Sequence, residues 1–207
     1  MIRLYVLDLQ QISPKQWPDL LPTLPEDRQR RVLACRQEPD RVRTAGAGWL
    51  LQFALSGAGI SVPAQRFTNN SWGKPQLEGR DDIHFSLSHC GRWVVCALSD
   101  TPVGVDVEKP RCTEAVARRF FRPDELTTLD PVFLTRLWTA KEAFVKALGR
   151  GLTIPLDSFA VRLNADCPVL EQSYTPLPYR LHEYRLGDDL LCLCSLGNSP
   201  EPTFVTI

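Results

Sequence analysis

The stretch that decides the fold is Leu137-Trp-Thr-Ala-Lys-Glu-Ala-Phe-Val-Lys-Ala-Leu-Gly-Arg-Gly151. Apolar residues recur in and just before it at spacings of three and four, which predicts a helix with one buried face. Asp130 and Pro131 supply an N-cap and a first-turn proline, and Gly149 with Gly151 supplies an end. The apolar stripe consists of Phe133, Leu137, Ala140, Phe144, Ala147 and Leu148.

Three charged residues of this helix have different expected surroundings. Glu142 and Lys146 are four residues apart, so their side chains are neighbours on the flank of the stripe. Taken alone, they are equally compatible with an ordinary surface ion pair. Lys141 falls inside the apolar arc, where an unpaired ammonium group is costly. We therefore expect the Lys141 side chain to extend to solvent or to meet a carboxylate.

Composition narrows the class of protein. The 207 residues suffice for one large domain or two smaller ones. The net charge of zero gives no overall attraction to nucleic acid or to an anionic membrane, and no apolar run is long enough to span a bilayer. The seven cysteines form no Cys-x-x-Cys pair, which favours reduced thiols over disulfides or a zinc site. With no signal peptide at its start, the chain is expected to be cytoplasmic.

The remaining pattern predicts an α+β fold. A short helix is expected from Ser13-Pro14, a basic helix after a capping box at Thr23–Glu26, and a longer helix from Asp40 to about Gly57. The segments 69–79 and 164–178 are expected to be loops. Helices set apart from hairpin-connected strands favour two similar halves, 1–101 and 102–207, each with a mainly antiparallel sheet on a long helix. Strands are predicted at 2–9, 83–88, 93–98, 103–108, 158–163, 179–186 and 190–195, with an edge strand at 204–205 and a further helix at 113–121.

Two carboxylates are expected side by side on the strand 103–108. Asp106 and Glu108 are two residues apart and therefore project from the same face. Adjacent carboxylates resist joint ionisation, and a divalent cation such as Mg²⁺ removes that conflict. Glu142 is a candidate for the third oxygen ligand. The alternative is that Asp106 and Glu108 are solvent-facing strand residues, and the Asp-x-Glu pattern alone does not decide between the two.

Other polar residues have candidate roles toward an anion. Ser88 and His89 are adjacent on a strand and point to opposite faces, which argues against a nucleophile–base pair. His89 is either a hydrogen-bond donor to a phosphate or ribose, or a structural histidine. Lys74 lies on a Gly-Lys-Pro turn, either solvated or facing a phosphate. Arg43 and Thr44 are placed in the first turn of the helix after Asp40, where free N–H groups favour an anion.

Taken together, these motifs resemble those of the 4′-phosphopantetheinyl transferases of the larger, monomeric, surfactin-synthetase-activating type. The resemblance covers most of the chain, from about Pro25 to Leu163. The motifs that carry it, in order, are Gly-Lys-Pro (73–75), Phe-Ser-Leu-Ser-His (85–89), Val-Gly-Val-Asp-Val-Glu (103–108), Arg-Phe-Phe (119–121) with Glu125, and the segment 137–152 with its Trp-x-x-Lys-Glu-Ala element.

The resemblance implies a reaction and a set of site residues. Such an enzyme moves the 4′-phosphopantetheine arm of coenzyme A onto a serine of an apo acyl or peptidyl carrier protein and releases 3′,5′-ADP, in a cleft between two similar halves. It implies Mg²⁺ at Asp106, Glu108 and Glu142, and Lys146 near the phosphates. We expect Glu142 to act as the general base. The coenzyme A contacts that the resemblance implies are Arg43, Thr44, Lys74, Ser88 and His89. It also implies a basic residue for the 3′-phosphate on the helix that contains Arg30 and Arg31, and Arg31 is the expected contact.

Two other functions are compatible with the residues. A different magnesium enzyme acting on diphosphates, such as a nucleotidyl transferase, would also use clustered carboxylates and a lysine, but would release other products. A non-catalytic module that binds coenzyme A or carrier proteins would bind without turnover. The carrier is usually acidic in the family that the chain resembles, and the basic helix Arg28–Arg36 would help to attract it.

Overall fold

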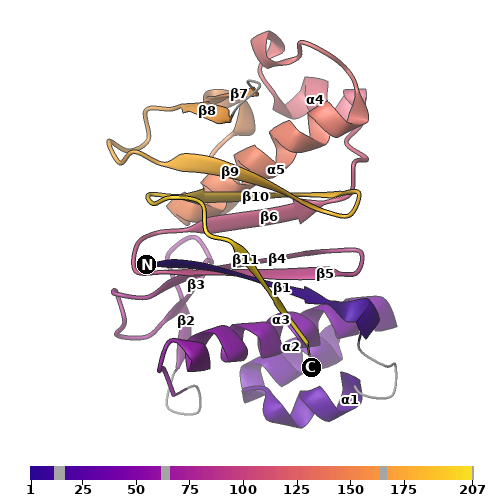
Figure 1. The fold of residues 1–207 in the computed structure, drawn as a ribbon, viewed down its shortest axis with the longest axis vertical. Helices are drawn as coiled ribbons and strands as arrows, with labels where there is room; N and C mark the ends of the chain where they lie inside the picture. Colours follow the sequence, from indigo (N-terminus) through magenta and orange to yellow (C-terminus); the bar gives the residue numbers. More distant parts are fainter. Residues whose placement is uncertain (12–16, 62–65, 164–166, 207) are drawn as a thin grey trace.

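The computed structural model describes residues 1–11, 17–61, 66–163 and 167–206, and it shows an α+β fold built in layers (Figure 1). One sheet has the strand order β11-β1-β5-β4 and another has the order β6-β10-β9. Neighbouring strands in both sheets are antiparallel, except that β11 runs parallel to β1. Their bounds are β1 Ile2–Asp8, β4 His84–Cys90, β5 Trp93–Ser99, β6 Gly104–Glu108, β9 Arg180–Leu186, β10 Asp189–Ser195 and β11 Pro202–Val205.

The two sheets pack on each other through one apolar layer. Side chains alternate along β1, so Leu4 and Val6 face the second sheet while Tyr5 and Leu7 face away from it. From the second sheet, Val105 and Val107 enter the same layer and are fully buried. The prediction that Val105 and Val107 of the strand 103–108 face the core is thereby confirmed.

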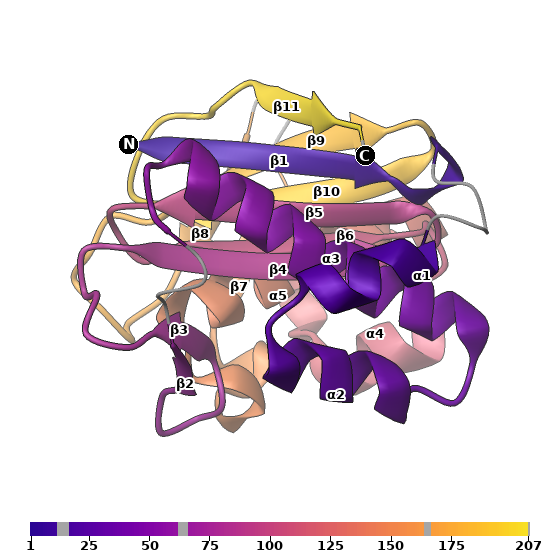
Figure 2. The same ribbon diagram turned by 90° about the horizontal axis from the view of Figure 1, so that it is seen from below.

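Helices cover the outer face of the first sheet. Figure 2 shows α3 crossing this face, with α1 and α2 farther out. Leu50, Leu51 and Ala54 of α3 are buried against Leu7 and Val94 of the sheet. This layer consists of α1 Trp17–Leu20, α2 Glu26–Ala34 and α3 Glu38–Gly57, with 3₁₀ turns at Leu9–Gln11 and Leu21–Thr23.

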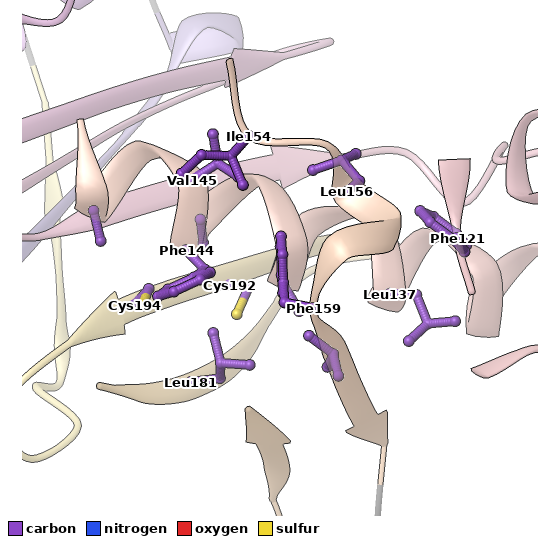
Figure 3. Packing of buried hydrophobic residues seen from close by; sticks show 14 of the residues in the cluster. Phe121, Leu137, Phe144, Val145, Ile154, Leu156, Phe159, Leu181, Cys192 and Cys194 are labelled. Carbon is purple, nitrogen blue, oxygen red and sulfur yellow. The ribbon is translucent and has the colours of Figure 1, made fainter. Parts of the chain in front are cut away.

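The helix α5 (Pro131–Leu148) covers the outer face of the second sheet, as its stripe predicts (Figure 3). The Asp130 carboxylate accepts a hydrogen bond from the Phe133 N–H, and Gly149 ends the helix with a φ of 68°. The stripe packs on Cys192 and Cys194 of β10. Nearby elements are α4 Glu114–Phe120 and 3₁₀ turns η4 Pro123–Glu125, η5 Gly151–Thr153 and η6 Leu156–Ser158.

Two short hairpins lie in or beside segments that the sequence pattern assigned to loops. The hairpin of β2 (Phe67–Asn69) and β3 (Pro75–Leu77) falls largely within 69–79, and β7 (Ala160–Leu163) pairs with β8 (Pro168–Glu171). Proline opens both β3 and β8, a position that strands tolerate but that reads as a loop signal in sequence. The loop predictions were wrong at β3 and β8, whereas β7 lies within the strand predicted at 158–163.

The predicted starts of two helices were also wrong. No side chain caps α2: Pro25 is its N-cap, and the Thr23 hydroxyl donates to the Leu20 carbonyl instead. The helix α3 begins at Glu38 rather than after Asp40, because a proline in its first turn sets the helical φ. Ser13-Pro14, predicted to open a helix, lies outside the described residues.

The α+β class and the antiparallel sheets are confirmed, whereas the pseudo-two-fold relation of two halves stays a prediction. In the described ranges, no helix is long and apolar enough to cross a membrane. The C-terminal strand β11 pairs with the N-terminal strand β1, so the last residues of the chain complete the first sheet (Figure 1).

Candidate active site

A glycine lets the helix α5 lie directly on the strand β6. A Cβ atom at Gly104 would stand 1.9 Å from the Ala143 carbonyl oxygen and 2.4 Å from the Ala147 nitrogen, so no side chain fits there. Gly104, Asp106 and Glu108 alternate onto the same face of β6. The close approach therefore brings the Asp106 carboxylate within reach of side chains on α5.

Lys146, Asp106 and Ser88 form the centre of the site. The Lys146 amine lies 2.6 Å from Asp106 Oδ1, and the Ser88 hydroxyl donates to the same oxygen at 2.8 Å. Lys146 also donates to the Ser88 hydroxyl at 3.2 Å. Three segments far apart in sequence, β4, β6 and α5, thus meet at one carboxylate.

The serines of β4 also hold this junction together. The edge strand β6 has backbone N–H groups that point away from β10, and the Ser86 and Ser88 hydroxyls accept hydrogen bonds from those of Val105 and Val107 at 3.1 and 3.4 Å. Ser88 consequently has a structural role that its alternating strand pattern did not reveal.

The charges of Asp106 and Glu108 both act on Glu142, the third predicted acid. Burial raises the pKa of Glu142 above its usual value, and the negative charges of Asp106 and Glu108 add to that rise, while Lys146 opposes it. Glu108 accepts a hydrogen bond from the Cys90 thiol at 3.2 Å and lies 3.6 Å from the Arg111 guanidinium. The negative charges of Asp106 and Glu108 therefore disfavour ionisation of Glu142.

The donor set fits a hard divalent cation. Asp106 Oδ2 is buried and has no hydrogen-bond partner, which is costly for a carboxylate oxygen. Oxygen ligands from carboxylates are those that Mg²⁺ prefers. Within the described residues, however, no three His, Cys, Asp or Glu side chains are already gathered as a metal-binding group. Instead, the Lys146 amine forms an ion pair with Asp106 Oδ1.

Basic residues gather around His89 beside this centre. Partial desolvation lowers the pKa of His89, and the positive charges of Arg43 and Lys146 lower it further. The Arg43 guanidinium is held by Asp40 Oδ1 at 2.5 Å. The charges of Arg43 and Lys146 therefore both act on His89, which like Arg43 is a predicted coenzyme A contact.

The prediction that Arg43 and Thr44 lie in the first turn of α3 was wrong. Arg43 and Thr44 lie in the second turn of the helix, beyond the free N–H groups of the first turn, because the helix begins at Glu38. Thr44 Oγ1 lies 3.5 Å from the Cys35 Sγ atom. Arg31, the remaining predicted contact, is exposed on α2.

Lys74 reaches the C-terminal end of α5. Its amine donates to the Lys146 carbonyl at 2.7 Å and to the Val103 carbonyl at 2.9 Å. Asn70 on the same turn donates to the Gly149 carbonyl at 2.7 Å. The last carbonyl groups of a helix lack partners within the helix, and this turn supplies side-chain donors to two carbonyls at the end of α5.

The Lys74 amine gives a pH-dependent prediction. Burial lowers its pKa from 10.5 to about 8. Between these values the unfolded chain keeps the proton and the folded chain releases it, so stability rises with pH. We expect the difference in unfolding free energy between the wild type and Lys74→Met to move in favour of the wild type from pH 8 to 10.5. Urea unfolding at several pH values measures it, and a shift in the opposite direction contradicts the lowered pKa.

A pocket of about 260 Å³ adjoins the site between the Lys74 turn, β4 and the end of α5. Its walls are largely apolar, and Lys146 stands at its edge. Sequence patterns did not single out the pocket residue Trp72, although it directly precedes the Gly-Lys-Pro turn. The residues that line the pocket are Trp72, Gly73, Lys74, Pro75, Phe85, Ser86, Leu87, Lys146, Gly149 and Gly151.

Comparisons with known proteins agree on one family. Residues 102–192 match the family model described as the 4′-phosphopantetheinyl transferase superfamily. A 4′-phosphopantetheinyl transferase of Bacillus subtilis is 41% identical over 133 residues, which are 60% of this chain and 56% of that protein. The transferase Sfp of B. subtilis strain 168 is 36% identical over 66% of each chain.

Another relative extends this coverage. The transferase HetI of Nostoc sp. is 33% identical over 173 residues, which are 76% of this chain and 73% of that protein. The matched region thus spans between about half and three quarters of the relatives' lengths. The family match at 102–192 contains Asp106, Glu108, Glu142 and Lys146.

Proposed function

We propose that this chain, which belongs to the 4′-phosphopantetheinyl transferase superfamily, transfers the 4′-phosphopantetheine arm of coenzyme A to a serine of an apo acyl or peptidyl carrier protein. The product besides the holo carrier is 3′,5′-ADP. One observation carries the proposal. Asp106 and Lys146 of the matched segment meet Ser88 beside a pocket, and the charges of both residues act on Glu142 of the same segment.

In the proposed reaction, the Glu142 carboxylate takes the proton of the carrier serine. The serine oxygen then attacks the phosphorus atom that carries the pantetheine arm. The bond from this phosphorus to the bridging oxygen breaks, and the bridging oxygen leaves with the electron pair as part of 3′,5′-ADP. Transfer of this kind depends mainly on positioning and on neutralised charge. Lys146 supplies a positive charge beside the departing group.

Asp106, Glu108 and Glu142 are the residues that would hold Mg²⁺, and the free Asp106 Oδ2 supports this assignment. When bound, the ion supplies positive charge for the diphosphate. Arg43, His89 and Lys146 offer further positive or donor groups for phosphates, and Arg31 and Thr44 are proposed contacts farther out. Lys74 is proposed to act on coenzyme A through its turn, because its amine is engaged by two carbonyls.

The same proposal covers the organisation of the chain. We propose that residues 1–101 and 102–207 form two similar halves, apart from β11, which pairs with β1 in the first sheet. We also propose that the pocket beside Lys146 belongs to the cleft between the halves. A monomeric state and a cytoplasmic location are proposed from the same family relationship. The carrier could serve fatty acid, polyketide or nonribosomal peptide synthesis.

Incubation with coenzyme A, MgCl₂ and a panel of apo carrier proteins tests the transfer itself. Mass spectrometry is expected to show one 4′-phosphopantetheine group added to a single serine of the carrier, with 3′,5′-ADP released in equal amount. Thermal stabilisation by coenzyme A without transfer to any carrier would favour a non-catalytic binding module. Release of pyrophosphate or phosphate would instead indicate a different diphosphate enzyme.

Removal of divalent cations gives a further prediction. Treatment with EDTA is expected to lower transfer about 100-fold or more, because several kcal/mol of charge stabilisation is lost. Added MgCl₂ is expected to restore the rate in the wild type but not in Asp106→Asn. Isothermal titration with MgCl₂ in the presence of coenzyme A supplies a second measurement. Full transfer in EDTA would contradict the assignment of a metal to these acids.

A further inference from the structure

A second charged pair lies inside the protein, on another face of α5. The Lys141 and Glu125 side chains are both fully buried, with the amine 2.7 Å from Glu125 Oε1. Lys141 also donates to the Leu156 carbonyl at 2.7 Å and to the Phe159 carbonyl at 2.8 Å. An ammonium group has three N–H donors, so all of its donors are used. Of the two outcomes predicted for Lys141, exposure to solvent or contact with a carboxylate, the structure shows the second.

Glu125 is equally well satisfied. Its Oε1 accepts from the Val161 N–H at 2.7 Å, and its Oε2 accepts from the Arg122 N–H at 2.9 Å. Through these bonds the pair joins α5 to η4 and to η6 with the residue after it. Glu125 also joins η4 to β7. Figure 3 shows Phe121, Leu156 and Phe159 in the apolar cluster that surrounds this region. The Lys141 amine lies 4.4 Å from the centre of the Phe159 ring.

Stability alone does not account for a pair of this kind. Moving two charges out of water is costly, and apolar residues of similar volume often give an equally stable fold. A hydrogen-bonded pair differs from apolar packing because its hydrogen bonds form only at one relative position of the two side chains. The stripe of α5 mixes small residues such as Ala140 and Ala147 with Phe144, which defines the rotation of the helix less sharply. The bonds of Lys141 define that rotation.

We propose that Lys141 and Glu125 are positioning residues that fix the rotation of α5 and thereby aim Glu142 and Lys146 at Asp106. The proposal deepens the proposed function and rests on it. Successive side chains project about 100° apart around a helix, so a rotation that displaces Lys141 displaces Glu142 with it. Neither member of the pair reaches the site itself, because both are enclosed by the core.

The test uses a neutral replacement of the whole pair. In Lys141→Met/Glu125→Gln, the amide oxygen still accepts from the Val161 or Arg122 N–H, and no unpaired charge remains. We expect this variant to fold, with a midpoint of thermal unfolding within about 10 °C of the wild type. Its kcat is expected to fall about tenfold or more while the KM for coenzyme A changes little, because small misplacements of reacting groups are costly. The matched control is Arg118→Met/Glu114→Gln, which neutralises an exposed pair on α4.

Each outcome bears on the proposal. A kcat equal to that of the wild type in the folded double variant would overturn it. If that variant does not fold, Glu125→Gln, which retains Lys141 and one of the two backbone hydrogen bonds that Glu125 accepts, takes its place with the same expectation. If the wild type transfers nothing, the proposed function fails, and crystal structures still test the positioning. Loss of the contact between Lys146 Nζ and Asp106 Oδ1 in the double variant supports the proposal, whereas an unchanged contact overturns it.

Discussion

Glu142→Gln is expected to lower kcat for transfer by about 10²–10⁴-fold, which is the usual value of a well-placed general base. The amide keeps the size of the side chain but cannot take the serine proton. The dissociation constant for coenzyme A is expected to change only modestly, because Arg43, His89 and Lys146 remain in place. Stopped or quenched transfer assays give kcat, and calorimetry with coenzyme A gives the binding constant.

A matched substitution separates this effect from a general loss of charge. Glu114→Gln changes an exposed glutamate on α4 that pairs with Arg118, so transfer should be unchanged. Burial and the nearby acids raise the pKa of Glu142, which is consistent with a carboxylate that accepts a proton readily. A Glu142→Gln enzyme with the turnover of the wild type would end the assignment of this residue as the base.

Gly104→Ala is expected to lower the free energy of unfolding by about 3 kcal/mol or more, at the upper end for an overpacked core. The new methyl group would stand 1.9 Å from the Ala143 carbonyl oxygen and 2.4 Å from the Ala147 nitrogen. Both are backbone atoms of α5, so no side-chain rotation relieves the clash and the helix must move away from β6. Transfer should fall with stability, because the same movement separates Lys146 from Asp106.

Gly57→Ala provides the control for this prediction. Gly57 is the last residue of α3, and a Cβ there would lie 3.6 Å from the Tyr5 hydroxyl, an ordinary contact. Alanine also favours the helix over glycine, so a neutral or slightly stabilising effect is expected. Chemical denaturation of the three proteins measures the difference. Equal stability of Gly104→Ala and the wild type would contradict the close approach of α5 and β6 at Gly104.

The helix α5 shows why part of the fold could be predicted from sequence. Its cap at Asp130, its apolar stripe and its end at Gly149 are local signals, and the structure confirms each of them. The alternation of Val105 and Val107 with Asp106 is likewise local and placed the acids on one face. The start of α3 was misplaced because Asp40 is a common N-cap residue, whereas the helix begins two residues earlier with Pro39 in its first turn.

The contacts between distant segments could not be predicted in this way. Nothing near Lys141 in sequence identifies Glu125 as its partner, since the pair depends on how η4 packs against α5. The Lys74 amine was expected either in solvent or facing a phosphate, whereas it donates to the Lys146 carbonyl at the end of α5 and to the Val103 carbonyl. Ser88 was expected to contact coenzyme A, and its hydrogen bonds to Asp106 and Lys146 appear only once β4 lies beside β6.

The central claim is that Asp106 and Glu142, from a strand and a helix, share one cation with the diphosphate of coenzyme A. Anomalous scattering from a crystal grown with Mn²⁺ and coenzyme A measures this directly. We expect a single strong Mn²⁺ peak within bonding distance of oxygens from both residues and from the diphosphate, with Lys146 displaced from Asp106 Oδ1. A peak elsewhere, or a Glu142 side chain turned away from the cation, would contradict the account.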